Sequence, residues 1–589
     1  VRFPGGCLVH DGSLDPNARD SMYRWKNTIG DVSERPSRRN NWKYNQTFGL
    51  GFYEYFLFCE DIGAKPVAVL PAAYDPHHDR EAPLDQLGPW IDDVLDLIEF
   101  ANGDTTTEWG RKRAELGHPE PFNLEYIAIG NEEVGQGYFE RYPIFQAAIR
   151  EKYPDIKVIC TSGPRPHGID FEIGWKHSRE FQADLVDEHY YMLPSWFLHN
   201  WRRYDNYDRN GPKVLVGEYG SWGNTFLNAL AEAAFMTGFE RNADVVKLTC
   251  YAPLLANIDY VNWKPNLIWF NNHQVYGTVN YYVQQMFNRN KGDVVLHSVL
   301  IENTAETQEY EIKRKEPIQG KAGVGTHKTS AQYRNFTVTH NDTGEVLVGG
   351  YFPNDSIDWT FENGDWTIVD GIIRQSSANL EECRATTGDP LWTNYTITVN
   401  GAKLDGEEGL QIIFGEQDKE NYYEWNVGGW MNCISTIRKM ENGTKATIAE
   451  IDKVSVQTGR EYKLKLEVCG RRIRCYVDDR LYFDMIDPVP YVEPLYYVAS
   501  QENRTGDVIL KVVNARARDM RVHVRLEGVD FIQPVGTVIE MVADRLDAAN
   551  TFEAPKRVVP VSRDIAGLGK SFNYNFRKHS ITILRLKTK

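Results

Sequence analysis

The sequence predicts an α/β barrel followed by all-β sandwich domains, and three observations support this fold class. Strands and helices alternate from residue 1 to about residue 290. Apolar runs in this part end in polar residues, as buried parallel strands do at the edge where active sites collect. From residue 293 onward, short strands separated by Gly, Asn and Asp replace the alternation. Because 589 residues are too many for one hydrophobic core, roughly two to four domains are expected.

The alternating half holds seven predicted strands, one fewer than a (β/α)₈ TIM barrel requires. Helices are predicted at 52–61, 88–101 and 138–152, and Asn224 is a candidate N-cap for a further helix. We expect the first barrel strand to precede Val1 and take the chain to be a fragment or a processed chain. An open doubly wound sheet is the alternative, although no Gly-rich phosphate loop follows the opening strand. The predicted strands are 1–6, 64–72, 124–132, 157–163, 184–191, 213–220 and 245–254.

Two of these strands end in glutamate, at Glu132 and Glu218. Glycoside hydrolysis with retention of configuration needs two carboxyl groups about 5 Å apart, one as nucleophile and one as general acid/base. Strands four and seven face each other across a barrel mouth, so their terminal glutamates can meet this distance. One such glutamate alone would indicate a salt bridge, whereas the pair favours a glycosidase. Glu133 competes with Glu132, but adjacent strand residues face opposite ways, so only one of them enters the mouth.

Several motifs in the first half, taken in order, resemble glycoside hydrolase family 51, the α-L-arabinofuranosidases. They cover residues 1 to about 290 with little interruption. The motifs are RFPGGC at 2–7, YRWKNTIG at 23–30, ERP at 34–36, IGNE at 129–132, DEHYY at 187–191, GEY at 217–219, YAPL at 251–254 and NLIWFNNH at 266–273.

The resemblance implies a (β/α)₈ barrel with the acid/base after strand four and the nucleophile after strand seven. It assigns the acid/base to Glu132, which follows Asn as in the family motif, and the nucleophile to Glu218. No metal or cofactor is implied. The family's first barrel strand, with its substrate-binding Glu, and its N-terminal segment have no match in this chain. Further implied site residues are Asn131 at the sugar 2-hydroxyl, Tyr191 at the nucleophile, His189 beside the pair (or simply a hydrogen-bonded barrel histidine), Arg2 and Cys7 at the pocket edge, and Asn266 at a polar sugar contact.

The β-rich half is predicted to hold two sandwiches, one inserted into the other. Residues 346–490 resemble a concanavalin- or laminin-G-like sandwich found inside secreted members of the family, through GLQIIFG at 409–415 and NYYEWNVGGW at 421–430. The predicted domains are a catalytic barrel at 1–292, a C-terminal sandwich built from 293–345 and 491–589, and the insertion at 346–490. Trp425 and Trp430 could stack on sugars, but core packing is the favoured interpretation, since both can point inward. Cys469 and Cys475 flank a predicted hairpin turn and are candidates for a disulfide.

Composition narrows the function classes. A formal net charge of −16 argues against nucleic acid as a partner, because phosphate binding needs a basic face. No apolar run of about 18 residues occurs, so no membrane span is expected.

The resemblance implies arabinose-containing plant polysaccharides, such as arabinoxylan and arabinan, as substrates, together with a homo-oligomer and an extracellular or periplasmic location. The alternatives are a related barrel enzyme, such as an endo-glucanase or xylosidase, and an inactive carbohydrate-binding protein, against which Asn131, Glu132 and Glu218 argue.

Overall fold

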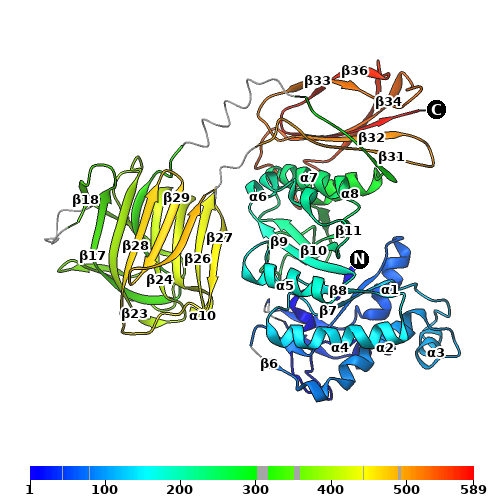
Figure 1. Cartoon of the computed structure of the whole chain (residues 1–589), viewed down its shortest axis with the longest axis horizontal. Coiled ribbons are helices and arrows are strands. Elements are labelled where there is room, and N and C mark those ends of the chain that lie inside the picture. Colours follow the sequence, from blue (N-terminus) through cyan, green and yellow to red (C-terminus); the bar gives the residue numbers. More distant parts are fainter. Residues whose placement is uncertain are drawn as a thin grey trace. The chain divides into compact units, whose positions relative to one another are not determined.

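The chain divides into two compact units, shown in Figure 1. The first unit comprises Val1–Val299 and Val492–Lys589, and the second comprises Leu300–Tyr491. The computed structural model describes residues 1–40, 42, 44–78, 80–301, 316–349, 358–441, 443–487 and 492–588. Each unit is described below by itself.

A parallel sheet of seven strands forms the centre of the first unit, which confirms the predicted strand count for the described residues. Its order follows the sequence, with β1 and β11 at the two edges. Alternate residues face opposite sides: Val67 and Val69 join the core inside the sheet, whereas Ala68 and Leu70 pack towards the helices. The strands are β1 (Arg2–Phe3), β4 (Val67–Leu70), β7 (Tyr126–Ile129), β8 (Lys157–Thr161), β9 (Leu185–Met192), β10 (Lys213–Ser221) and β11 (Val246–Tyr251).

Helices cover the outer face of this sheet, and most of its strand residues are buried, although the edge strand β11 is partly exposed. Thr225, and not the predicted Asn224, is the N-cap of the helix after β10, where it pairs with Asn228 in a capping box. Asn224 instead donates through its amide to Asn280. The helices are α1 (Phe52–Asp61), α2 (Gly88–Asn102), α3 (Glu108–Glu115), α4 (Gln136–Lys152), α5 (Ile169–Glu180), α6 (Pro194–His199), α7 (Phe226–Arg241) and α8 (Val279–Arg289).

Short strands and turns decorate the first unit around the sheet. The small sheet β12–β13–β14 follows β11 in the sequence, and two hairpin-like pairs, β2–β3 and β5–β6, lie in the long loops after β1 and β4. Their bounds are β2 (Ser37–Arg39), β3 (Asn45–Thr47), β5 (Tyr74–Asp75), β6 (Arg80–Glu81), β12 (Leu255–Asn257), β13 (Ile268–Phe270) and β14 (Val275–Gly277).

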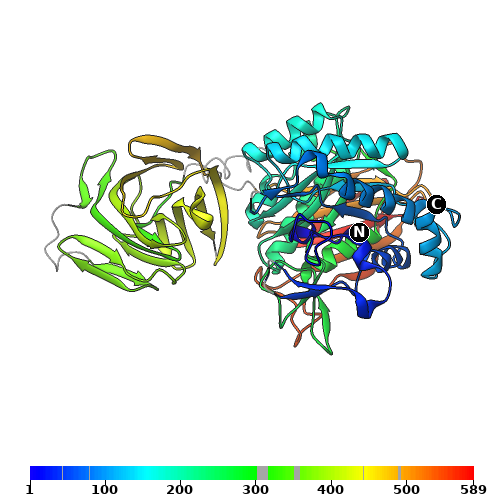
Figure 2. The same cartoon turned by 90° about the horizontal axis from the view of Figure 1, so that it is seen from below.

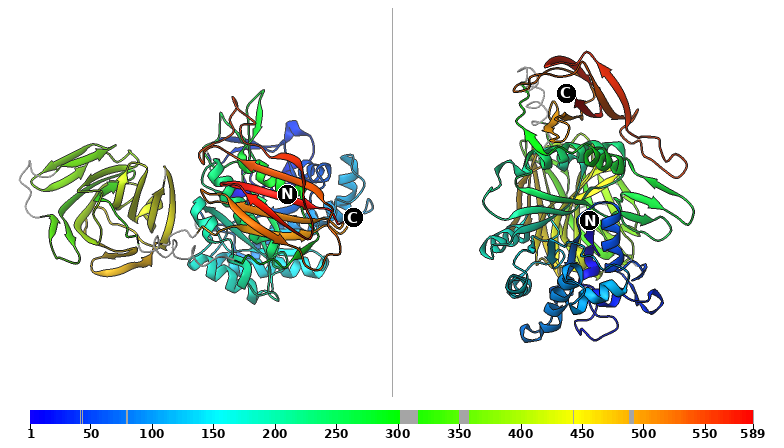
Figure 3. Two further views of the ribbon diagram at one scale, coloured as in Figure 1. Left: turned by 90° about the horizontal axis from the view of Figure 1, so that it is seen from above. Right: turned by 90° about the vertical axis from the view of Figure 1, so that its right-hand side faces the viewer.

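An antiparallel sheet of six strands packs on α7 and α8, on the side away from the barrel (Figure 3, right). Tyr496, Ile509 and Ile583 from this sheet share one hydrophobic core with α7. Lys511 on β32 is buried against Glu240 of α7 and forms an ion pair with it. The sheet order is β15 (Val294–Leu296), β31 (Tyr496–Gln501), β32 (Val508–Asn514), β37 (Ser580–Leu586), β34 (Val535–Val542) and β35 (Val561–Ala566), with β33 (Met520–Arg525) and β36 (Ser571–Phe576) as a separate pair.

The second unit is a sandwich of a seven-stranded and an eight-stranded sheet that enclose one core (Figure 2). Ala322 and Val324 of one sheet meet Ala331 and Tyr333 of the other in that core. The sheets contain β16 (Lys321–Thr326), β17 (Thr329–His340), β18 (Val346–Val348), β19 (Trp359–Glu362), β20 (Trp366–Val369), β21 (Ile372–Gln375), β22 (Cys383–Thr387), β23 (Tyr395–Gly406), β24 (Leu410–Asp418), β25 (Asn421–Gly428), β26 (Ile434–Glu441), β27 (Thr444–Asp452), β28 (Glu461–Cys469), β29 (Arg472–Val477) and β30 (Arg480–Ile486), with the short helix α10 (Gly429–Asn432) after β25.

The inserted unit therefore begins earlier than predicted. The prediction places 293–345 in the C-terminal sandwich, but of the residues described in this range only Val294–Leu296 pair there, with β31. Strands β16 and β17 instead pair inside the insertion, β16 with β22 and β24, and β17 with β21 and β23. The start consequently moves from 346 to Leu300. The predicted end at 490 falls among residues 488–491, which lie outside the described residues.

The structure distinguishes between the alternatives that the sequence left open for two tryptophans and two cysteines of the insertion. Trp425 is completely buried in the sandwich core and donates its ring N–H to Ser435, so it does not stack on a sugar. Trp430 is 59% exposed and has a left-handed backbone (φ +50°). Cys469 and Cys475 are both free thiols, because Cys475 points into the core while Cys469 is exposed at the end of β28.

None of the described helices combines the length and the apolar character needed to cross a membrane.

Candidate active site

The two predicted carboxylates meet at the carboxyl ends of β7 and β10. One carboxylate oxygen of Glu132, one of Glu218 and a ring nitrogen of His189 lie within 4.8 Å of one another. Retaining glycosidases place their two carboxyl groups about 5 Å apart, whereas inverting enzymes separate them by about 6.5–9.5 Å to admit a water molecule. The separation between Glu132 and Glu218 is thus that of a retaining pair.

A β-bulge in β10 turns Glu218 towards the barrel mouth. Leu215 faces the barrel interior, so strict alternation would point residue 218 outward. The register against β9 shifts between Val216 and Glu218, after which Glu218 pairs with His189, a residue on the inner face. Gly217 is required at the bulge, because a Cβ there would lie 2.1 Å from Oδ1 of Asp187.

Glu218 accepts one hydrogen bond at each carboxylate oxygen. Arg2 on β1 donates from Nη1 to Oε1 at 2.9 Å, and the Tyr191 hydroxyl donates to Oε2 at 2.9 Å. The Tyr191 contact corresponds to the role expected for it, whereas Arg2, expected at the pocket edge, contacts Glu218 directly. Together the two donors fix the orientation of the carboxylate.

Arg2 also anchors Asn131. Its Nη2 donates to Oδ1 of Asn131 at 2.5 Å and lies 3.2 Å from Oδ2 of Asp187. Burial lowers the pKa of Arg2, but the carboxylates of Asp187 and Glu218 outweigh it and leave the pKa raised. The contact with Arg2 fixes which way the Asn131 amide faces. Its buried Nδ2 has no hydrogen-bond partner in the described part of the chain. That amide is therefore a donor available to a substrate hydroxyl.

His189 joins Glu132 to Asp187. Its Nδ1 lies 2.7 Å from Oε1 of Glu132, and its Nε2 lies 3.2 Å from Oδ2 of Asp187. Burial lowers the pKa of His189, but the charges of Asp187 and Glu218 and these hydrogen bonds raise it to about 10. Burial raises the pKa of Glu132, while the hydrogen bond and charge of His189 bring it below its usual value. Without substrate, the proton of this pair therefore resides on His189, one short hydrogen bond from Glu132.

The loop after β7 separates Glu132 from Glu133. Gly130 has φ +83° and Glu132 has φ +55°, so the chain leaves the strand through left-handed conformations. Glu133 turns into a different buried pocket, where its Oε1 lies 3.6 Å from Nδ1 of His10 and burial raises its pKa. The choice of Glu132 over Glu133 agrees with this placement.

Cys7 lies at the edge of the site, and Asn266 contacts the loop that carries Trp263. The Cys7 thiol donates to Oε2 of Glu132 at 3.8 Å, and burial, with the charges of Glu132 and Glu218, holds its pKa well above the ordinary range. The completely buried Asn266 donates its amide to the backbone carbonyl of Trp263. Its buried Oδ1 has no hydrogen-bond partner among the described residues, so the sugar contact expected for Asn266 stays a prediction.

Three residues near the carboxylates were missed from the sequence. Asp187 lies two residues before His189 on the same face of β9, so period-two spacing would have found it. Trp222 and Trp263 come from loops, where no periodic signal exists. Their rings lie 5.1 Å apart, and Trp263 lies 5.1 Å from the ring of Tyr191. A cavity of about 460 Å³ adjoins this aromatic cluster and is lined by Ile258, Val261, Asn262, Trp263, Lys264 and Trp269.

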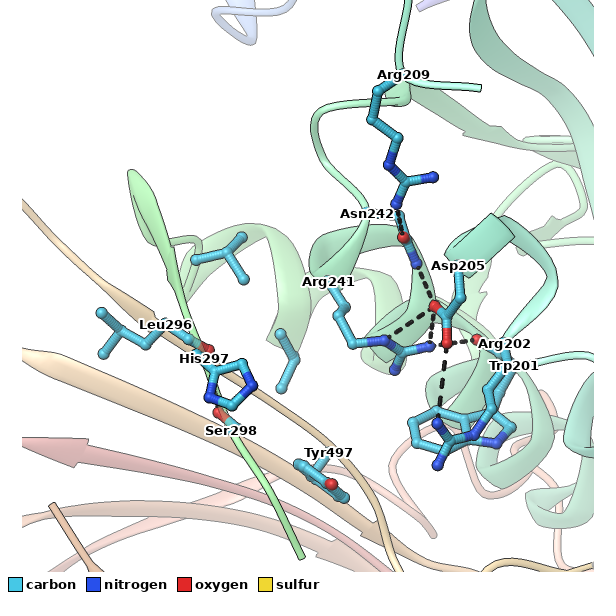
Figure 4. A pocket seen from close by; sticks show the side chains of 12 residues that line it. Trp201, Arg202, Asp205, Arg209, Arg241, Asn242, Leu296, His297, Ser298 and Tyr497 are labelled. Carbon is cyan, nitrogen blue, oxygen red and sulfur yellow. Dashed lines mark hydrogen bonds and ion pairs between the residues drawn. The ribbon is translucent and has the colours of Figure 1, made fainter. Parts of the chain in front are cut away.

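A second cavity, of about 420 Å³, contains none of the predicted site residues (Figure 4). Asp205 accepts hydrogen bonds there from Arg241 and Asn242, and Arg209 donates to Asn242. The wall on the opposite side comes from residues 295–298 and from Tyr497 and Val498. Among the described residues that line this cavity, Asp205 is the only carboxylate. The cavity therefore lacks the pair of opposed carboxylates that glycoside hydrolysis needs.

A parallel barrel in which the ends of β7 and β10 present two carboxylates within 4.8 Å defines a glycoside hydrolase. Comparison with known proteins narrows this class. Residues 1–209 match the family model of the α-L-arabinofuranosidase 1 domain, and residues 217–580 match that of the α-L-arabinofuranosidase C-terminal domain. The chain belongs to the α-L-arabinofuranosidases of glycoside hydrolase family 51.

Individual relatives agree with this membership. The chain is 44% identical to an extracellular exo-α-L-arabinofuranosidase of Streptomyces chartreusis, over 100% of this chain and 71% of that protein. It is 39% identical to α-L-arabinofuranosidase 1 of Arabidopsis thaliana, over 52% of this chain and 43% of that protein. An arabinose-bound family 51 α-L-arabinofuranosidase structure superposes with a TM-score of 0.61 at 21% identity, covering 100% of this chain and 64% of that one, which shows the fold alone.

Proposed function

We propose that this protein is a retaining exo-α-L-arabinofuranosidase that removes terminal arabinofuranosyl residues from arabinoxylan- or arabinan-type polysaccharides. The observation that carries the proposal is the separation of Glu132 and Glu218, within 4.8 Å, inside a barrel of this family. The names of the relatives support arabinofuranose as the sugar.

The reaction runs in two displacements. In the first, a Glu218 carboxylate oxygen attacks the anomeric carbon while Glu132 donates its proton to the glycosidic oxygen, and the alcohol leaves. The product of this step is an arabinosyl ester on Glu218. In the second, Glu132 removes a proton from water, the water oxygen attacks the anomeric carbon, and the bond to Glu218 breaks. Two inversions give net retention.

The surrounding residues supply specific help. Arg2 and Tyr191 hold the Glu218 carboxylate in the attacking orientation. Asn131 offers its unpaired amide to the sugar 2-hydroxyl, a contact that strengthens as positive charge develops on the ring. His189 delivers a proton to Glu132 across their 2.7 Å hydrogen bond when substrate binds, because the acid step needs Glu132 protonated.

The cavity at Trp263 fits the leaving-group side of the site. Its wall includes two tryptophans, Trp263 and Trp269, and aromatic faces stack on sugar rings. The ring of Trp263 is also 5.1 Å from Tyr191, which touches the nucleophile. A neighbouring sugar of the polymer is therefore expected in this cavity.

One experiment tests the activity and its stereochemistry together. The chain is incubated with aryl α-L-arabinofuranoside, aryl β-xyloside and soluble β-glucan, and the first-formed product is followed by proton NMR. Release of α-configured arabinose from the first substrate alone is the expected result. Initial β-arabinose would exclude retention, turnover of xyloside or glucan alone would assign another specificity, and inertness towards all three would indicate a binding protein.

We also propose secretion, because the Streptomyces relative is named extracellular. Fractionation of the producing cells, with the activity assayed in each fraction, tests this location.

A further inference from the structure

A second cluster of ligating side chains adjoins the other carboxylate oxygen of Glu132. The Cys7 sulfur and one ring nitrogen each of His10 and His77 lie within 4.8 Å of one another. Cys7 Sγ is 3.8 Å from Nε2 of His77 and 3.8 Å from Oε2 of Glu132. Cys7 lies in the 3₁₀ turn Gly6–Val9 and His10 follows that turn directly, whereas His77 follows β5. Two segments that are distant in the sequence therefore supply the cluster.

His10 is the most informative member of this cluster. It is completely buried, yet neither ring nitrogen has a hydrogen-bond partner among the described residues. Buried imidazole nitrogens are ordinarily satisfied, so an unpartnered one that faces two other ligating groups indicates a ligand. Nδ1 lies 3.6 Å from Oε1 of Glu133, which leaves Nε2 for that ligand. A carboxylate behind a metal-binding histidine is the usual means of orienting its ring.

We propose that Cys7, His10 and His77 form a binding site for a thiophilic divalent cation such as Zn²⁺, and that the bound ion inhibits the enzyme by engaging Glu132. Zinc bonds of about 2.3 Å to sulfur and 2.0–2.1 Å to nitrogen place tetrahedral ligand atoms about 3.6 Å apart. The 3.8 Å between Cys7 Sγ and His77 Nε2 is close to that value. Oε2 of Glu132 lies at the same distance from the sulfur, so an ion held by the three side chains would be adjacent to this carboxylate.

The neighbouring cluster of Glu132, His189 and Glu218 does not compete for the ion. The Arg2 guanidinium donates to Glu218 and lies 3.2 Å from Asp187. This buried positive charge repels a divalent cation from that cluster. The Cys7 cluster contains one thiol and two imidazoles, a donor set that selects zinc-like ions over Mg²⁺ or Ca²⁺.

Inhibition follows from the position of the ion beside Glu132, and this part of the inference rests on the proposed function. A divalent cation next to Oε2 stabilises the ionised carboxylate of Glu132, so this residue neither carries a proton to the leaving group nor accepts one from water. Formation of the sulfur–metal bond releases the Cys7 thiol proton to solvent. Binding consequently tightens as pH rises, with one proton released per ion.

The test measures binding apart from activity. Chain freed of metal with EDTA is titrated with Zn²⁺ against a chromophoric chelator, and separately with Co²⁺ followed by absorption. One Zn²⁺ per chain, and a Co²⁺ spectrum with a thiolate charge-transfer band that Cys7→Ser removes, are expected. Zn²⁺ at that stoichiometry should abolish arabinofuranoside hydrolysis, EDTA should restore it, and Mg²⁺ should do neither.

Two exposed histidines on one turn give a matched pair of variants. His77→Asn should keep the basal activity, bind Zn²⁺ at least tenfold more weakly and resist inhibition. His78→Asn, whose ring contacts Asp75 instead, should behave as the unsubstituted chain does. Equal Zn²⁺ affinity in both variants, a Co²⁺ spectrum without the thiolate band, or no binding at all would overturn the site. If Zn²⁺ binds as described while no arabinofuranoside is hydrolysed, only the proposed function fails.

Discussion

His189 Nδ1 lies 2.7 Å from Glu132 Oε1, while Nε2 of the same ring lies 3.2 Å from Asp187. The imidazole is therefore held between two carboxylates in a buried site. This arrangement raises the pKa of His189 to about 10. The proton that catalysis needs is stored one hydrogen bond away from the residue that uses it.

Stability should fall in alkali because of this histidine. The pKa of His189 is about 10 in the folded chain and ordinarily near 6.5, so the folded state binds more protons between these values. The stabilisation is complete below pH of about 6.5 and is lost as pH rises through about 10, with a slope of at most about 1.4 kcal/mol per pH unit. Urea unfolding at pH 6, 8 and 10 measures it. His189→Gln should show a smaller loss over this range, and equal losses would refute the assignment.

Glu218→Ala should abolish turnover of every arabinofuranoside, because the attacking group is removed. The control is Glu133→Ala, which removes a buried carboxylate in the loop after β7 but leaves the nucleophile in place. Steady-state kinetics with an aryl arabinofuranoside provide the measurement. Residual activity of Glu218→Ala within tenfold of the unsubstituted chain would rule out its role as nucleophile.

Glu132→Ala should respond to the leaving group. With a dinitrophenyl arabinofuranoside, protonation is scarcely needed, so the first step survives and the arabinosyl ester accumulates on Glu218. With a poor leaving group, kcat/KM should drop about 10²–10⁴-fold. Azide needs no base, so it should restore turnover and yield an arabinosyl azide of retained configuration. Product of inverted configuration, or rescue of Glu133→Ala instead, would contradict the assigned roles.

Asn131→Ala should lower kcat/KM about 10²–10³-fold, because a transition-state hydrogen bond to the 2-hydroxyl is lost. The same substitution should matter far less on a 2-deoxy arabinofuranoside, which lacks the accepting group. Comparing the two substrates in both chains gives a double-mutant cycle. Equal losses on both substrates would show that Asn131 acts only through Arg2.

Gly217→Ala should destabilise the first unit by about 1–3 kcal/mol, because its Cβ would fall 2.1 Å from Asp187. Gly88→Ala is the control, since a Cβ at the start of α2 would meet nothing within 4 Å and should be neutral or slightly stabilising. Denaturant midpoints of the two variants measure the difference. If Gly217→Ala were as stable as Gly88→Ala, the bulge would accommodate a Cβ at residue 217 and the steric argument would be wrong.

Sequence patterns predicted most of the barrel and both carboxylates, because buried parallel strands read as short apolar runs ending at the active edge. They could not predict how Glu218 faces inward, since alternation from Leu215 points it outward and the bulge at Gly217 reverses that. The start of the insertion was misplaced for a related reason. Strands β16 and β17 alternate like any half-buried strand, and alternation does not reveal which core receives the apolar face. Likewise Trp425 and Trp430 differ in burial through the turn between them, which composition does not encode.

The pairing of β15 with β31 determines how the inserted unit affects folding of the first unit. Leu296 lies opposite Ala499, so the points where the chain leaves this sheet and returns to it are adjacent. In folding, the whole inserted unit acts as a loop whose closure entropy grows only with the logarithm of its length, about 0.6 kcal/mol per doubling. A sandwich interposed between two neighbouring strands therefore adds little to the thermodynamic burden of the barrel. The main effect of the insertion is kinetic. During synthesis β31 leaves the ribosome long after β15, so the pairing of these two strands is delayed until the inserted unit has been made.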